Sequence, residues 1–314
     1  MCNPYSLRLV DCKYRECIKE YLHELTSVQT RYQAIEQDHS SVLRLVINMS
    51  AASELKAVDK LTITFVVDNC IEWMTKLPPG FIQEVPQHLF HPDVPKDPRT
   101  GVPFVDLENY CCGGGKVIGR LLDDPTFEEI EGLGGVVETH AEGHAVAGGA
   151  VWVSGEIPRV THFEGGLPSG VRWVEREGRG EWVKEEDLMD ERYAAIDVVG
   201  KGLVIFSACS HAGIVNVVKD AVEKFSRPVY MIIGGLHLAG TELVDRIPPT
   251  VDYLANQMRP APTYVLPMHC TGFAAKVALE HALGEGCVPA GVGHKVIVEG
   301  TPESERMIHP PTES

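Results

Sequence analysis

The alternation of strand and helix patterns in the second half of the chain restricts its fold more than any other feature. Short apolar runs typical of buried strands end in turn residues, and longer segments with apolar residues at helical spacing lie between them. The predicted strands are residues 149–153, 193–199, 202–208, 229–233, 263–266 and 295–298, and the predicted helices are residues 214–225, 250–258 and 273–283. This order favours a layered α/β domain over a helical bundle or an all-β sandwich.

The first half of the chain is less regular. Residues 13–47 show helical spacing, residues 61–67 alternate as a strand does, and residues 78–103 are too rich in proline and glycine for a helix. We therefore predict three parts: a helical N-terminal extension of unknown function at residues 1–60, a folded domain at residues 61–300 and a polar tail at residues 301–314. An irregular junction at about residues 70–110 interrupts the domain.

Charge and cysteine content limit the classes of partner. The formal net charge is -16, which disfavours nucleic acids and anionic membranes. The sequence shows neither a secretory signal nor an apolar run long enough to span a bilayer, so a cytoplasmic location is expected. The nine cysteines lack the spacing of a zinc ribbon or a disulfide scaffold, and no Cys-x-x-Cys pair supports a redox enzyme.

Three histidines occupy the same position relative to a predicted strand. His211, His237 and His269 each follow one, where the chain turns into a loop. Strand ends of a layered α/β domain face a common crevice, so three imidazoles there can converge on one metal ion or one anionic ligand. A single histidine at a strand end is more often a hydrogen-bonded structural group. The shared context of the three favours a site.

Two cysteines flank these histidines. Cys209 lies two residues before His211, and Cys270 follows His269. A thiolate is a good zinc ligand, but adjacent strand residues point to opposite faces. We therefore interpret both cysteines as structural and keep the ligand alternative open.

Several ordered motifs resemble one branch of the metallo-β-lactamase superfamily, that of the dihydropterin ribofuranosyl-aminobenzene phosphate synthase-like proteins. The motifs are Val153-Ser-Gly-Glu-Ile-Pro-Arg159, Leu188-Met-Asp-Glu-Arg192, Ser207-Ala-Cys-Ser-His-Ala-Gly213 with Asn216, Gly234-Gly-Leu-His-Leu238 and Met268-His-Cys-Thr-Gly272. The resemblance runs from about Trp152 to Lys295, and residues 61–69 resemble the opening strand of the same branch.

The resemblance implies an αββα sandwich that holds up to two ions of zinc or a similar divalent metal at the edge between its sheets. It implies His211 and His269 as metal ligands, His237 as a ligand or as a donor behind the ligands, and Glu156 near the position of a further ligand. In such proteins a metal-activated hydroxide attacks a small substrate.

The chain departs from the superfamily in one respect. The His-x-His-x-Asp-His motif, which supplies most ligands of the first metal, is absent from the sequence. Its place falls between about Asn69 and Gln87, so the sandwich is expected to be incomplete in its first half. The residues that could substitute for the missing ligands are His88, His91, Asp93, His140, Glu142 and His144.

Two functions remain open from the sequence. The first is a metal-dependent hydrolase that acts on a small phosphorylated or ester-like substrate. The second is a degenerate, non-catalytic domain, a pseudoenzyme, whose exposed surface binds a protein partner or a second copy of the chain. The missing motif leaves open whether the chain is an enzyme, because a catalytic zinc ordinarily needs three protein ligands.

Overall fold

The computed structural model describes residues 54–66, 79, 96–102, 125–166, 170–176, 178–184, 189 and 191–301. The chain divides into two compact units, residues 1–48 with 84–139 and residues 49–83 with 140–314. The predicted helices at residues 13–47, the strand end at Asp68 and Asn69 and most of the junction and the tail lie outside the described residues. The division into extension, domain and tail stays a prediction.

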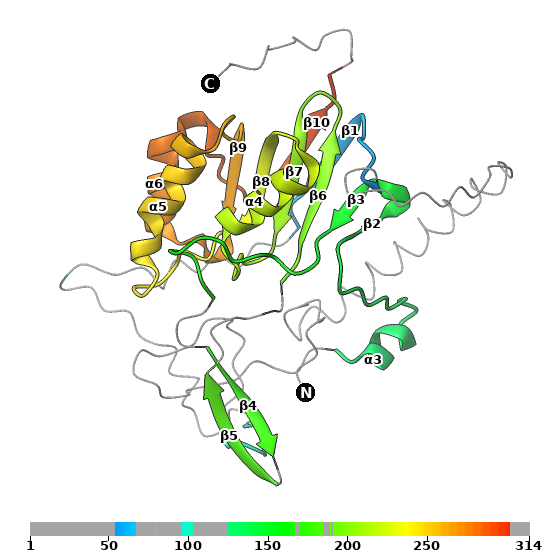
Figure 1. Cartoon of the computed structure of the whole chain (residues 1–314), viewed down its shortest axis with the longest axis vertical. Coiled ribbons are helices and arrows are strands. Elements are labelled where there is room, and N and C mark those ends of the chain that lie inside the picture. The colour runs from blue at the N-terminus through cyan, green and yellow to red at the C-terminus, as the bar shows by residue number, and fades with distance from the viewer. Residues whose placement is uncertain are drawn as a thin grey trace, which may run out of the picture. The chain divides into compact units, whose positions relative to one another are not determined.

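A mixed sheet forms the centre of the second unit (Figure 1). Its strand order is β2-β3-β6-β7-β8-β9. The strands are β2 (His144–Val146), β3 (Val151–Val153), β6 (Tyr193–Val198), β7 (Gly202–Ser207), β8 (Val229–Gly235) and β9 (Tyr264–Met268). Strands β7, β8 and β9 are parallel to one another, and the other neighbours are antiparallel. β6 and β7 form the hairpin that the sequence predicts.

Helices cover one face of this sheet. They are α4 (Ile214–Phe225), α5 (Ile247–Asp252) with its continuation η5 (Tyr253–Gln257), and α6 (Phe273–Leu283). Leu203 and Ile205 of β7 share a hydrophobic core with the apolar side of α4, because alternate strand residues point to the same face. Pro248 and Pro249 occupy the first turn of α5, where a missing amide hydrogen costs little. The helix therefore begins earlier than predicted.

A second, smaller sheet covers the opposite face. It consists of β1 (Lys60–Thr64) and β10 (Lys295–Glu299), which are antiparallel. Ile63 and Val298 pack there in one cluster with Val204 of β7, which points away from the helices. The described layers are thus helix, sheet and sheet. The layered α/β fold class predicted from the sequence is confirmed.

Some elements were not predicted. A hairpin of β4 (Val171–Arg176) and β5 (Arg179–Lys184) pairs Trp173 with Trp182, whose rings lie 5.3 Å apart. Half of the residues in its strands are charged, so they lack the apolar runs by which the others were found. In the first unit, Thr126 caps α3 (Phe127–Gly132). The remaining short turns of helix are η3 (Ala147–Gly149), η4 (Val244–Arg246), η6 (His269–Thr271) and η7 (Gly284–Gly286).

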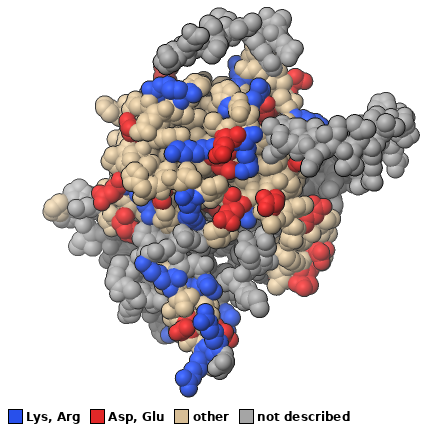
Figure 2. Space-filling model, viewed as in Figure 1, with Lys and Arg blue, Asp and Glu red and all other residues tan. Residues whose placement is uncertain are grey.

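The surface carries charges of both signs. Figure 2 shows Lys and Arg side chains interspersed with Asp and Glu over the described part of this face. Among the described residues, no helix is long and apolar enough to cross a membrane.

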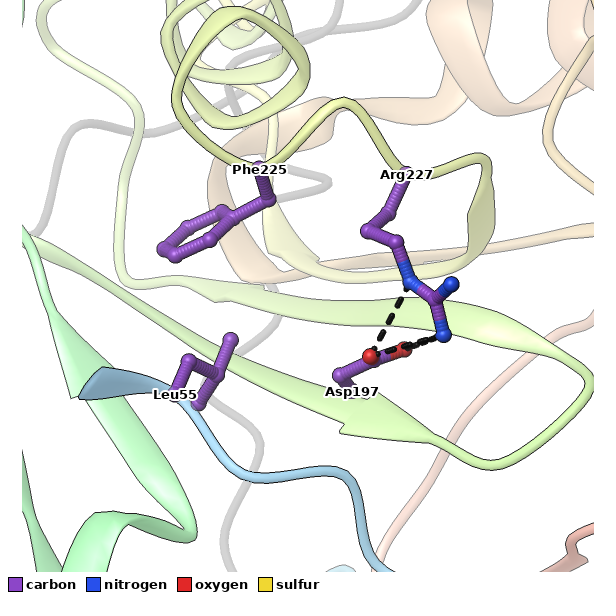
Figure 3. A pocket seen from close by; sticks show the side chains of 4 residues that line it. All are labelled: Leu55, Asp197, Phe225 and Arg227. Carbon is purple, nitrogen blue, oxygen red and sulfur yellow. Dashed lines mark hydrogen bonds and ion pairs between the residues drawn. The ribbon is translucent and has the colours of Figure 1, made fainter. Parts of the chain in front are cut away.

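A pocket of about 220 Å³ lies beside the starts of β7 and β8. Figure 3 shows Leu55 and Phe225 on one side of it and the ion pair of Arg227 with Asp197 on the other. The Arg227 guanidinium in this pocket is already neutralised by the Asp197 carboxylate, 2.9 Å away. The predicted histidines follow the opposite ends of these strands, so this pocket is not part of their site.

Candidate metal centre

The three parallel strands end side by side. Ser207 of β7 pairs with Gly234 of β8, and Gly234 pairs with Pro267 of β9. The loops that follow these strands carry His211, His237 and His269, respectively. The parallel register therefore brings all three histidine-bearing loops to one edge of the sheet, as the strand order predicts.

Hydrogen bonds join the three loops. The Ser210 hydroxyl donates to the Gly235 carbonyl oxygen at 2.6 Å, and the Leu236 amide donates to the Thr271 hydroxyl at 3.2 Å. The amides of Leu238 and Ala239 both donate to the Cys270 carbonyl oxygen at 3.0 Å. The three loops are therefore held together by hydrogen bonds within the protein.

His211 and His237 form a buried pair. Their ring centroids lie 4.8 Å apart with the rings nearly perpendicular, and the residues are 2% and 3% exposed. Neither ring nitrogen of His237 makes a hydrogen bond of ordinary geometry, although its side chain acts on the neighbouring Cys270 thiol, and its backbone is left-handed at φ 50°. A buried polar atom without a partner costs about 1–3 kcal/mol, and backbone strain of this kind is concentrated at functional sites. His237 is therefore poorly explained as a purely structural residue.

His269 lies in a second group with two thiols. Its Nε2 is 2.8 Å from the Cys209 Sγ, and the Cys270 Sγ donates to the Cys209 carbonyl oxygen at 3.2 Å. The ligand atoms of Cys209, His269 and Cys270 all lie within 4.8 Å of one another. Burial raises the pKa of the Cys270 thiol, but the Cys209, His237 and His269 side chains outweigh it and hold this pKa well below its ordinary value.

Gly235, at the end of β8, leaves room for this group. A Cβ atom at this position would lie 2.5 Å from the Cys270 Sγ and 2.7 Å from the His269 Nε2. Both distances are shorter than van der Waals contact permits. The close approach of the thiol and the imidazole to β8 thus requires glycine here.

Glu191 holds the loop after β7 in place by hydrogen bonds. Its buried carboxylate accepts hydrogen bonds from the amides of Cys209 at 2.9 Å and Ala212 at 3.3 Å. In the sequence, Glu191 belongs to the motif Leu188-Met-Asp-Glu-Arg192, which by itself predicts no role for this residue. Its position directly before β6, which pairs with β7, was the available signal.

Glu164 fixes the start of α4 in a similar way. Its carboxylate accepts from the amides of Val215 at 2.9 Å and Asn216 at 3.0 Å. Burial raises the pKa of Glu164, although these hydrogen bonds and one from Thr161 act to lower it. Gly213 begins this helix at φ 98°, and any side chain there would meet the Glu164 carboxylate. Sequence reasoning missed this residue too.

The other predicted ligands lie elsewhere. Glu156 is exposed and does not join the group of Cys209, His269 and Cys270. Of the substitute ligands, His140 stacks on His144 with centroids 3.8 Å apart, and neither they nor Glu142 join this group in the described part of the chain. His88, His91 and Asp93 lie outside the described residues.

Strand geometry, on which the two cysteines were interpreted as structural, does not apply to their positions in the structure. β7 ends at Ser207 and β9 ends at Met268, so Cys209 and Cys270 lie in loops beyond the strands. Ser210 has a φ of 60°, and residues His269–Thr271 form a 3-10 turn. The rule that adjacent residues point to opposite faces holds only inside a strand. It therefore did not apply to these thiols.

Comparisons with known proteins agree with the motifs. No protein-family model matches the chain. An uncharacterized protein of Methanocaldococcus jannaschii is 34% identical over 129 residues, which are 40% of this chain and 42% of that protein. The 7,8-dihydropterin-6-methyl-4-(beta-D-ribofuranosyl)-aminobenzene-5'-phosphate synthase of the same organism is 38% identical over 92 residues, which are 29% of this chain and 30% of the synthase.

The chain thus spans less than half the length of either curated relative that it matches. Among solved structures, that of Tm1679, a metal-dependent hydrolase of the beta-lactamase superfamily, is 25% identical and covers 52% of this chain and 58% of its own, with a TM-score of 0.42. The match to the synthase confirms the resemblance to its branch of the metallo-β-lactamase superfamily.

Proposed function

We propose that this chain is a metal-dependent hydrolase of the metallo-β-lactamase type, with a divalent ion held at the ends of β7, β8 and β9. The observation that carries the proposal is His237, whose two ring nitrogens are buried against the ring of His211 without a hydrogen bond of ordinary geometry. Imidazole nitrogens are preferred zinc ligands, and a bound ion would give one of the two buried nitrogens of His237 a partner. The residues present therefore fit a divalent metal of the zinc type.

The proposed substrate is a small phosphorylated or ester-like molecule, because a relative of this chain is named as the synthase of a ribofuranosyl-aminobenzene 5'-phosphate. When bound, a divalent ion supplies the Lewis acidity that activates water for hydrolysis. The chain's own residues set the geometry around it. The Glu191 carboxylate accepts a hydrogen bond from the Cys209 amide in the loop that carries His211, and Arg159 donates to the His211 carbonyl oxygen at 3.2 Å.

A non-catalytic domain is the second candidate. It is favoured by the absence of the His-x-His-x-Asp-His motif from the sequence, which leaves fewer histidines for a catalytic ion than the superfamily provides. In that case the histidines at the strand ends hold a structural ion or none, and the chain acts by binding a protein partner or another copy of itself. A cytoplasmic location is proposed for either function.

The test combines metal content with hydrolysis. Full-length protein purified without a histidine tag or chelator is measured by elemental analysis and assayed with bis(p-nitrophenyl) phosphate and p-nitrophenyl acetate. We compare it with His237→Asn, because asparagine tolerates the left-handed backbone. His281→Asn, an exposed histidine on α6, is the matched control.

We expect about one or two ions per chain and metal-dependent hydrolysis, both reduced at least tenfold in His237→Asn and unchanged in His281→Asn. Metal without hydrolysis would favour the non-catalytic domain. Protein that neither contains nor takes up metal would overturn the proposal.

A further inference from the structure

We infer that Cys209, His269 and Cys270 form a thiolate-rich site for a soft divalent metal ion of the zinc type. The inference rests on the proposed function for the presence of an ion at this edge of the sheet. It adds two sulfur donors, which the resemblance does not supply, to the imidazole of His269, which the resemblance implies as a ligand. The ligand atoms come from the loops after β7 and β9, which are neighbours of β8 on its two sides.

The spacing of the donors suits a tetrahedral ion. With zinc–sulfur distances near 2.3 Å and zinc–nitrogen distances near 2.1 Å, a sulfur and a nitrogen ligand lie roughly 3.5 Å apart and two sulfurs roughly 3.8 Å apart. The three ligand atoms all lie within 4.8 Å of one another, and the Cys209 Sγ is 2.8 Å from the His269 Nε2. That contact needs to open by less than about 1 Å to admit an ion.

The backbone around the donors is fixed. The Cys209 amide is held by the Glu191 carboxylate, and the Cys270 carbonyl oxygen accepts two amides from the loop after β8. Gly235 allows the Cys270 thiol and the His269 imidazole to approach β8 closely. A metal site needs ligands held by surrounding hydrogen bonds in this way, since ligands free to move bind more weakly.

The three proposed ligands differ in how far they are exposed to solvent. Cys209 and Cys270 are 4% and 1% exposed, whereas His269 is half-buried. An ion bound by these three residues would be shielded on its sulfur side and accessible on its imidazole side. Three protein ligands with one accessible position is the arrangement in which a zinc ion can also take a water or a substrate atom.

Cobalt is the probe that reports on the donor atoms. Co²⁺ bound by thiolates gives a sulfur-to-metal charge-transfer band in the near ultraviolet, whereas Co²⁺ bound by nitrogen and oxygen alone does not. We titrate the full-length protein with Co²⁺ and then with Zn²⁺. Cys209→Ser and Cys270→Ser are the test variants, and Cys287→Ser is the control, since Cys287 is a half-buried thiol outside the group.

We expect the band in the unmutated protein, its displacement by Zn²⁺, a loss of at least half of its intensity in either test variant and no change in Cys287→Ser. Co²⁺ binding without the band would overturn this inference while leaving the proposed function intact. Absence of any metal binding would overturn both.

A second measurement uses only the unmutated protein, so its result does not depend on whether a variant folds. Unmutated protein is alkylated with iodoacetamide with and without Zn²⁺, and each cysteine is followed by mass spectrometry of its peptide. Zn²⁺ should slow modification of Cys209 and Cys270 at least tenfold and leave Cys287 unchanged. Equal rates with and without the ion, or a Cys209–Cys270 disulfide that persists in protein prepared under reductant, would exclude the site.

Discussion

At the scale of single residues, Gly235 is the glycine whose missing side chain bears most directly on the candidate metal site. Its missing side chain gives space to a thiol and an imidazole from a different strand end. We predict that Gly235→Ala displaces Cys270 and His269, because real Cβ contacts do not come within 3 Å. Overpacking of this kind costs about 1–3 kcal/mol, and it would displace the Cys270 thiol and the His269 imidazole from their positions beside β8. Zinc content by elemental analysis should fall at least fivefold, and the melting temperature should drop.

The matched control for this change is Gly165→Ala. Gly165 belongs to the same unit, and a Cβ there would meet nothing within 4 Å. Its zinc content and melting temperature should equal those of the unmutated protein. A Gly235→Ala variant that retains its zinc would show that the ion is bound elsewhere.

Individual site residues were only partly predictable from the sequence. The position of His211, His237 and His269 after strands was sufficient to place them at one edge, because parallel strands end together. Which donors approach one another depends on loop geometry beyond the strand ends. Ser210 turns with a left-handed backbone, and the sequence pattern does not predict that Cys209 approaches His269.

At the scale of elements, the start of α4 depends on a carboxylate from a distant loop. Glu164 accepts two amides of the first turn, and burial raises its pKa above the ordinary value of 4.5. A carboxyl whose pKa is raised by folding favours the folded state in its protonated form. That contribution is complete below the ordinary, unfolded pKa of 4.5 and is lost as the pH rises through the raised folded value.

We therefore predict a pH-dependent effect of Glu164→Gln. The glutamine side chain stays neutral, so it loses one acceptor oxygen at every pH but does not incur the cost of a buried charge. Relative to the unmutated protein, the free energy of unfolding of the variant should increase as the pH rises from about 4 through the raised pKa. Urea unfolding followed by circular dichroism at several pH values measures it. A difference that is the same at every pH would contradict the prediction.

The elements themselves were predictable where apolar periodicity is strong. Helix α4 has the predicted bounds, because a continuous apolar side that includes Val218 and Ala221 packs on the sheet. The β4–β5 hairpin and the short β2 were missed. The hairpin strands interrupt their apolar residues with charged ones and β2 has only three residues, so their strand conformation follows from pairing with a neighbour rather than from their own pattern.

At the scale of the whole described unit, the second sheet is built from residues far apart in the sequence. β1 pairs with β10, which joins residues 60–64 to residues 295–299. The chain just before β1 also contacts the central sheet, since the Val58 amide donates to the Asp197 carbonyl oxygen at 2.8 Å and Val58 bridges to Val198. The predicted domain start at residue 61 therefore lies within a segment that already contacts the core.

These contacts give that boundary a direct test, in which a chain that begins at Glu54 is compared with one that begins at Leu61. The shorter chain loses Leu55, which lines the pocket in Figure 3 and packs against the main core. It also loses four backbone hydrogen bonds. The Lys56 and Val58 amides donate to the carbonyl oxygens of Gly149 and Asp197, and the Val58 and Asp59 carbonyl oxygens accept from the amides of Val199 and Gly300. Each such bond contributes about 1 kcal/mol, so we expect a net loss of roughly 2 kcal/mol after the entropy of ordering the segment.

For a domain of this size that loss corresponds to a melting temperature lower by about 5 °C. Differential scanning calorimetry of the two chains at equal concentration measures it. Leu55→Ala in the longer chain isolates the contribution of the apolar contact, and it should account for only part of the difference because the backbone hydrogen bonds remain. Equal melting of the two chains would place the start of the domain at residue 61, as the sequence pattern predicts, and would mean that the contacts of residues 55–59 contribute nothing to stability.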